Sequence, residues 1–250
     1  MNTIHQTAVT TGDKESKMKI TNANLIRWAG LSAMVGGFLF VAIQPLHPPD
    51  ILSSVTTSSW AIVHYVGVAM CLLILLGLSG IYARQAEKAG WLGLAGFLML
   101  SFMWALTAAF QFFEAIFSPL LAIHAPSLEE GILHMVSNSA SAVSLGALPI
   151  VWSIVGVLYL LGGVLFGIAT FRAGILPRWA AALLAFGTVL PIFLSSLFPH
   201  PLDRFFAVPV GIALAWLGYA LWSERREPAV EAVAGRGIPS SAIPELSKVA

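Results

Sequence analysis

The side chains of this sequence that could do chemistry are concentrated near one set of ends of its apolar segments. Six polar residues form the candidate pocket: Gln44, His47, His64, Gln111, Glu114 and His200. His64 and Glu114 are embedded in apolar runs, where a polar group is costly to bury and is therefore informative. We expect these two to face each other, or to be joined by water, in an outward-facing polar pocket for a small molecule or lipid. The alternative is that they only mark an interface, where polar side chains reach water at little cost.

Metal chemistry is a second interpretation of the same residues, because imidazole nitrogens and carboxylate oxygens are zinc ligands. His47, His64, His200 and Glu114 could supply such a set, in a metal- or haem-dependent membrane oxidoreductase or hydrolase. However, the sequence has no His-Glu-x-x-His spacing, and no histidine lies near the centre of an apolar run, where a buried haem would bind. The metal and the cofactor therefore stay unknown at this stage.

Other reaction classes have weaker support in the sequence. There is no Gly-x-Ser-x-Gly motif and no phosphate-binding loop, so no catalytic residue can be named and enzyme activity is uncertain. No basic patch indicates a nucleic-acid partner. A transporter of a small, weakly polar solute is a further alternative, because the apolar segments lack the mid-depth polar groups of an ion-coupled carrier.

The elements that must position these residues are membrane-spanning helices. Apolar residues make up 58% of the 250 residues and charged residues only 10%, which excludes an ordinary soluble domain. A bilayer crossing takes roughly 20 apolar residues, and the backbone must be helical to satisfy its polar groups. The sequence predicts an all-α, six-helix transmembrane bundle with spans at about 28–46, 60–83, 91–117, 147–171, 179–199 and 205–222. This six-helix domain covers residues 24–223, between disordered cytoplasmic tails at 1–23 and 224–250.

The basic residues predict the orientation. Of the 13 Lys and Arg residues, all but Arg204 fall in the terminal segments or in the connections after the second and fourth spans. Cytoplasmic segments carry such an excess, so both termini are expected in the cytoplasm. In general organisation the chain resembles small bacterial membrane proteins, and we expect it in the plasma membrane.

Short, similar sequences at equivalent positions along the chain indicate a repeat of three helical hairpins. Arg27-Trp28-Ala29 opens the first span and Arg178-Trp179-Ala180 opens the fifth. Three such hairpins would be parallel repeats about an axis along the membrane normal. The alternative is that Trp and Arg simply favour membrane boundaries.

Two further patterns concern packing. The long outer loop, residues 118–146, contains a capping-box pattern in Ser127 and Glu130, which predicts a short helix on the outer interface. Small residues recur at helical spacing, which permits close helix packing or a homo-oligomer face: Ala29, Ala33 and Gly37; Gly163 and Gly167; Ala181 and Ala185.

Overall fold

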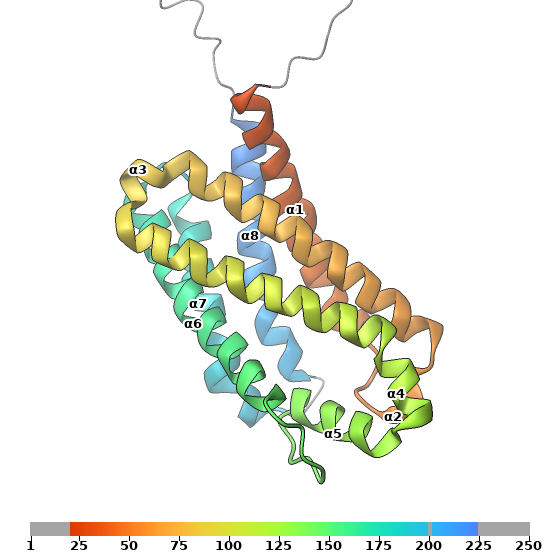
Figure 1. Cartoon of the computed structure of the whole chain (residues 1–250). Helices are drawn as coiled ribbons and strands as arrows, with labels where there is room; N and C mark the ends of the chain where they lie inside the picture. The colour runs from red at the N-terminus through yellow and green to blue at the C-terminus, as the bar shows by residue number, and fades with distance from the viewer. Residues whose placement is uncertain (1–20, 200–201, 225–250) are drawn as a thin grey trace, which may run out of the picture.

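The computed structural model describes residues 21–199 and 202–224, and within that part of the chain every regular element is helical (Figure 1). The long helices are α1 (Asn22–Leu46), α3 (Ser58–Ile116), α6 (Leu148–Ala173), α7 (Arg178–Leu194) and α8 (Val208–Ser223). Between them lie α2 (Leu52–Val55), α4 (Ser118–His124), α5 (Pro126–Val136) and two 3-10 helices, η1 (Ser195–Leu197) and η2 (Leu202–Ala207). His200 and nearly all of the two expected tails lie outside the described residues, although α1 already begins at Asn22.

Within the described residues the structure confirms an all-helical chain, and four of its helices are long and apolar enough to cross a membrane, so the expected count of six is not confirmed. These four, among the described residues, are α1, α3, α6 and the stretch Leu202–Ser223. The difference has a structural origin. Two of the expected spans are the arms of the 59-residue α3, and α7, which is also apolar, has only 17 residues.

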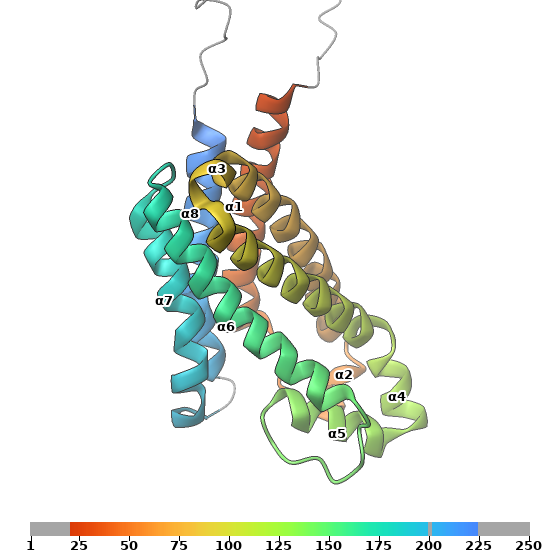
Figure 2. The same ribbon diagram turned by 60° about the vertical axis from the view of Figure 1, so that its left-hand side comes forward.

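Helix α3 turns back on itself at Gly90 (Figure 1). This residue has φ 56° and ψ −155°, a conformation that glycine adopts without the steric penalty of a Cβ. The turn divides α3 into a first arm, residues 58–89, and a second arm, residues 91–116. The two arms lie side by side in both views (Figures 1 and 2).

The long helices pack in chain order and close into a ring. Helix α1 contacts the first arm of α3, the second arm contacts α6, α6 contacts α7, α7 contacts α8, and α8 returns to α1. Three hairpins would give this order, but so would any up-and-down bundle of six segments. The hairpin repeat therefore stays a prediction.

The small-residue stripes are used for contacts within the chain. A Cβ on Gly37 would lie 2.5 Å from the carbonyl oxygen of Gly211, and a Cβ on Gly77 would lie 2.6 Å from Cα of Ala33. At the α6–α7 contact, a Cβ on Gly167 would lie 2.7 Å from Ala185 Cβ. In lipid, such backbone approach gains dispersion contacts that apolar burial cannot supply. These stripes therefore serve helix packing within the chain, and a homo-oligomer stays a prediction.

The two ends of the bundle differ in charge. We call the end with the start of α1, the Gly90 turn, the α6–α7 connection and the end of α8 the basic end (Figure 1). The described basic residues at this end are Arg27, Arg84, Lys88, Arg172 and Arg178. The opposite end, which we call the loop end, carries α2, α4, α5, η1 and η2. Arg204 is the one basic residue there among those described.

The long loop is more ordered than the sequence predicts, and the expected capping box is wrong. Helix α5 begins one residue before Ser127, with Pro126 in its first turn and Ala125 as a cap that makes no side-chain hydrogen bond. Proline suits a first helical position because its missing N–H has no partner there, so Ser127 already lies inside the helix. Leu133 of α5 packs with Val55 and Trp60, so this helix covers the loop end of the bundle.

Candidate functional site

A cavity of about 910 Å³ lies at the loop end of the bundle. Its walls come from α1, both arms of α3, α6, α7, η2 and the segment that follows α5. Eight lining residues carry amide, imidazole, carboxyl or guanidinium groups: Gln44, His47, Asp50, Gln111, Glu114, Asn138, Asp203 and Arg204. All eight lie close to the loop end of their helix or in the segments beyond it.

The cavity becomes apolar toward the middle of the bundle. Its deeper walls include Phe40, Met70, Met103 and Trp104. Met103 lies 13 residues before the end of α3 at Ile116, which is about 20 Å along a helix at about 1.5 Å per residue. The cavity therefore combines a polar loop end with an apolar interior.

Tyr159 adds one polar atom to the deep wall. It lies 11 residues after the start of α6, or about 17 Å along the helix. Its hydroxyl is buried and has no hydrogen-bond partner within the described residues. A buried hydroxyl normally has a partner, so this atom is suited to meet a polar group of a bound molecule.

The structure brings His64 and Glu114 together at the loop end of α3. His64 is completely buried, and its Nε2 lies 3.3 Å from a carboxyl oxygen of Glu114. The other ring nitrogen, Nδ1, lies 2.7 Å from the carbonyl oxygen of Trp60. Because a backbone carbonyl only accepts, Nδ1 carries hydrogen. Nε2 lies within ion-pair distance of the Glu114 carboxyl group, although the two are not in hydrogen-bond geometry.

Trp60 fixes the geometry of this pair. Its Nε1–H donates to the carbonyl of Glu114 over 2.9 Å, and its ring centroid lies 4.3 Å from that of His64. The residue sits in the first turn of α3, where the Thr57 hydroxyl accepts a hydrogen bond from the Trp60 backbone N–H. Thr57 is thus an N-cap that sets where the helix starts and hence where Trp60 points.

His47 links the pair to the mouth of the cavity. It follows α1 directly, and its ring centroid lies 4.9 Å from that of His64. Burial is the main cause that lowers the pKa of His47, to about 4, and the positive charge of Arg204 acts in the same direction. Nδ1 of His47 donates to the carbonyl of Pro48 over 2.7 Å, so Nδ1 is the nitrogen that carries hydrogen when the ring is neutral.

An ion pair closes one side of the mouth. Arg204 of η2 lies 2.5 Å from a carboxylate oxygen of Asp50, and both side chains are largely buried. The pair joins the segment after α1 to the segment before α8. It therefore holds two parts of the ring together where the cavity meets the loop end.

Glu129 of α5 is a second buried carboxyl group close to this site. It is completely buried, and neither of its carboxyl oxygens has a partner in hydrogen-bond geometry within the described residues. Burial raises the pKa of Glu129 to about 7, and the negative charge of Glu114 adds to this effect. Ser118 and His64 act in the opposite direction but more weakly than burial.

Some of the predicted site residues line the cavity and others do not. Gln44, His47, Gln111 and Glu114 line the cavity, whereas His64 lies behind Glu114 and does not line it. His200 lies outside the described residues. That the lining residues bind a ligand stays a prediction.

Sequence reasoning missed Glu129, Tyr159 and the role of Trp60. Glu129 shares a helical face with Ile132 and Leu133, both of which are buried. This spacing of three and four residues is the sequence signal from which its burial could have been predicted. Tyr159 is a lone hydroxyl in the apolar run of the fourth expected span, where a polar atom is informative.

The geometry of the described residues gives no support to a metal site. Among the described residues, no three or more His, Cys, Asp or Glu side chains are grouped so that they could hold a metal ion. The His64–Glu114 pair alone supplies two ligands, fewer than the three or four of a zinc site.

Comparison with known proteins identifies no relative. No family model matches the chain, and neither a curated protein nor a solved structure matches it. The function must therefore be argued from the cavity.

Proposed function

We propose that this chain is a six-crossing membrane protein whose loop-end cavity opens outward and binds a small amphipathic molecule, such as a lipid. The observation that carries this proposal is the change in character along the cavity, from polar side chains at the loop end to aromatic and methionine side chains inside. Ligand pockets are mostly apolar with a few placed polar groups, and this cavity has that composition. A ligand with a polar head and an apolar body would match both parts.

The lengths of the segments support six crossings. The two arms of α3 have 32 and 26 residues by their numbering, and each exceeds the roughly 20 residues that a bilayer requires. Helix α7 and η1 together run from residue 178 to 197, which is just sufficient. Six crossings place both termini on one side of the bilayer.

The basic residues support a cytoplasmic position for the basic end. Arg204 is the exception, and its charge is neutralised by Asp50 in a largely buried pair. Cytoplasmic segments carry the Lys and Arg excess, so the loop end and its cavity would face outward from the plasma membrane. Cysteine labelling in intact cells checks this: residues 50–58 and 125–140 should react from outside, and residues 85–89 and 173–177 should not. The reverse pattern would contradict the orientation.

Binding can be tested by comparing two phenylalanine variants on α6. Gly156 lines the cavity, and a Cβ built on it meets no atom within 4 Å, so Gly156→Phe should fill space without a backbone clash. Val157 is exposed on the outer surface of the same helix, and Val157→Phe is the matched control.

Small molecules extracted from the purified proteins would then be compared by mass spectrometry. We expect the wild type and Val157→Phe to retain the same amphipathic compound in near-stoichiometric amount, and Gly156→Phe to lose it at least severalfold. Equal retention by all three proteins, or retention by none, would contradict binding in this cavity.

A further inference from the structure

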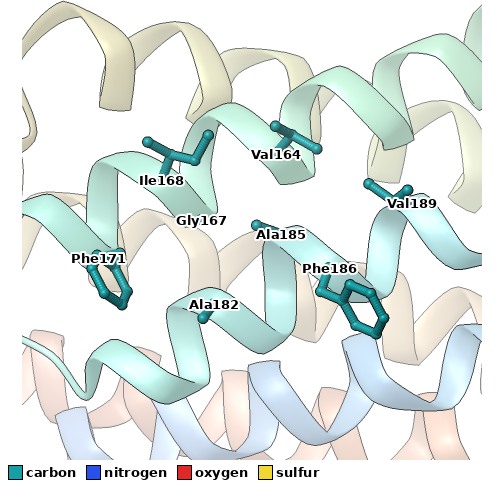
Figure 3. A pocket seen from close by; sticks show the side chains of 8 residues that line it. All are labelled: Val164, Gly167, Ile168, Phe171, Ala182, Ala185, Phe186 and Val189. Carbon is teal, nitrogen blue, oxygen red and sulfur yellow. The ribbon is translucent and has the colours of Figure 1, made fainter.

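A second, wholly apolar pocket of about 400 Å³ lies on the outer surface between α6 and α7 (Figure 3). Small residues on the facing sides of the two helices leave this space, and larger exposed side chains stand beside it. The small lining residues are Gly167, Ala182 and Ala185, and the larger exposed ones are Ile168, Phe171 and Phe186. We call this pocket the α6–α7 groove.

The groove begins near the basic end and reaches toward mid-depth. Ala182 lies four residues after Arg178, at the start of α7, and Val189 lies 11 residues after it. At about 1.5 Å per residue these positions are about 6 Å and 17 Å from the start of the helix. This is the depth of the acyl chain immediately below a headgroup in a leaflet about 15 Å thick.

Arginine side chains flank the basic end of the groove. The guanidinium carbon of Arg178 lies 5.8 Å from the centroid of the Phe171 ring, which is itself part of the groove. Gly174 gives this guanidinium room, since a Cβ there would lie 3.0 Å from Nη2 of Arg178. Arg172 is exposed one residue beyond Phe171. In the part of the chain that the structure describes, no carboxylate forms an ion pair with either arginine.

We propose that the α6–α7 groove binds an anionic phospholipid of the cytoplasmic leaflet. One acyl chain lies in the groove, and the phosphate contacts Arg178 and Arg172. A guanidinium group pairs well with phosphate oxygens because its donors form a planar fork. This inference rests on the proposed function only for the position of the basic end at the cytoplasmic leaflet, where anionic lipids are concentrated.

Native mass spectrometry of the full chain in detergent tests this proposal, with phosphatidylglycerol and phosphatidylcholine of the same acyl chains as probes. We expect the wild type to retain phosphatidylglycerol in preference to phosphatidylcholine. Each of the variants Arg178→Gln and Arg172→Gln should reduce that preference about fivefold, the effect of one basic residue near an anionic lipid surface. Lys88→Gln, an exposed basic residue at the same end, should leave it unchanged.

A second pair of variants tests the groove separately from the charge. Ala182→Leu fills the groove and should reduce retention of both lipids, whereas Ala105→Leu, on the exposed surface of α3, should not. Equal retention of the two lipids by the wild type, or an equal effect of Lys88→Gln and Arg178→Gln, would overturn the proposal. The experiment does not involve the loop-end cavity, so its failure would leave the Gly156→Phe comparison to decide that function.

Discussion

The indole Nε1–H of Trp60 donates a hydrogen bond of 2.9 Å to the carbonyl of Glu114, a residue 54 positions further along the chain. The two residues lie at the loop ends of the two arms of α3, so this bond ties together the open end of that hairpin. Trp60 is fully buried and also packs on His64. One side chain therefore connects the fold of the hairpin with the geometry of the site.

Trp60→Phe should destabilise the protein because phenylalanine cannot donate to the Glu114 carbonyl and leaves a small void. We expect a loss of about 1–3 kcal/mol in the free energy of unfolding, measured in mixed micelles. Trp91→Phe is the control, since Trp91 is 85% exposed, and it should change stability by less than about 0.5 kcal/mol. Similar effects of the two substitutions would contradict the role of Trp60.

Removing one partner of the His64–Glu114 pair should leave the other buried without its counterpart. His64→Ala should cost about 2–4 kcal/mol and Glu114→Gln somewhat less, because glutamine keeps the shape of the side chain. The double variant should be less destabilised than the sum, with a coupling of about 1 kcal/mol or more. His134 is half-buried and its ring contacts the carbonyl of the exposed Ala140, so His134→Ala should have little effect on stability or ligand retention. Strict additivity would show that the two groups do not interact.

Glu129 predicts a dependence of stability on pH. Its pKa is raised to about 7 in the folded protein from an ordinary value of 4.5. Between these two values the folded carboxyl keeps its proton while the unfolded one has lost it, so stability falls as pH rises through this window. The difference in unfolding free energy between Glu129→Gln and the wild type should therefore shift in favour of the variant by about 3 kcal/mol between pH 4 and pH 8.

Chemical unfolding at a series of pH values measures this effect. Glu130 is exposed on the same helix, so Glu130→Gln should leave the pH profile of the wild type unchanged. A profile for Glu129→Gln that runs parallel to the wild type would show that Glu129 is not the responsible group.

Two helical glycines should respond oppositely to alanine. A Cβ on Gly37 would lie 2.5 Å from Gly211 O and 2.6 Å from Ala215 N, both backbone atoms that cannot move aside locally. Gly37→Ala should therefore cost about 2–3 kcal/mol of unfolding free energy. Gly156 has open space around it, and Gly156→Ala should be neutral or stabilising by up to about 1 kcal/mol, owing to helix propensity. A neutral Gly37→Ala would mean that α1 and α8 are not packed so closely.

The sequence predicted the helical segments well because each apolar run is long and bounded by charged or aromatic residues. It also predicted that His64 and Glu114 lie close together, since both are embedded at a similar depth from the same ends of their spans. Depth along a helix can be counted from a boundary residue at about 1.5 Å per residue, whereas rotation about its axis is set by packing.

Packing between distant segments is what the sequence could not supply. The closure of α8 on α1 depends on backbone contacts between Gly37 and Gly211, which no local pattern encodes. The position of Glu129 depends on α5 folding over the loop end, and the start of that helix was misplaced because Pro126 begins it before Ser127. The pocket residues were thus identifiable by type and depth, but the cavity itself required the tertiary structure.

The central claim is that the loop-end cavity is open to the outer solution, and cysteine accessibility tests it most directly. The single native cysteine, Cys71, is completely buried and can be replaced by alanine. Thr107 lines the cavity about 13 Å from the end of α3, whereas Phe102, on the same arm, is exposed on the outer surface. We expect a charged, membrane-impermeant thiol reagent added outside intact cells to modify Thr107→Cys but not Phe102→Cys, and Gly156→Phe to slow the reaction at position 107. Equal protection of both cysteines from the external reagent would contradict an outward-open cavity.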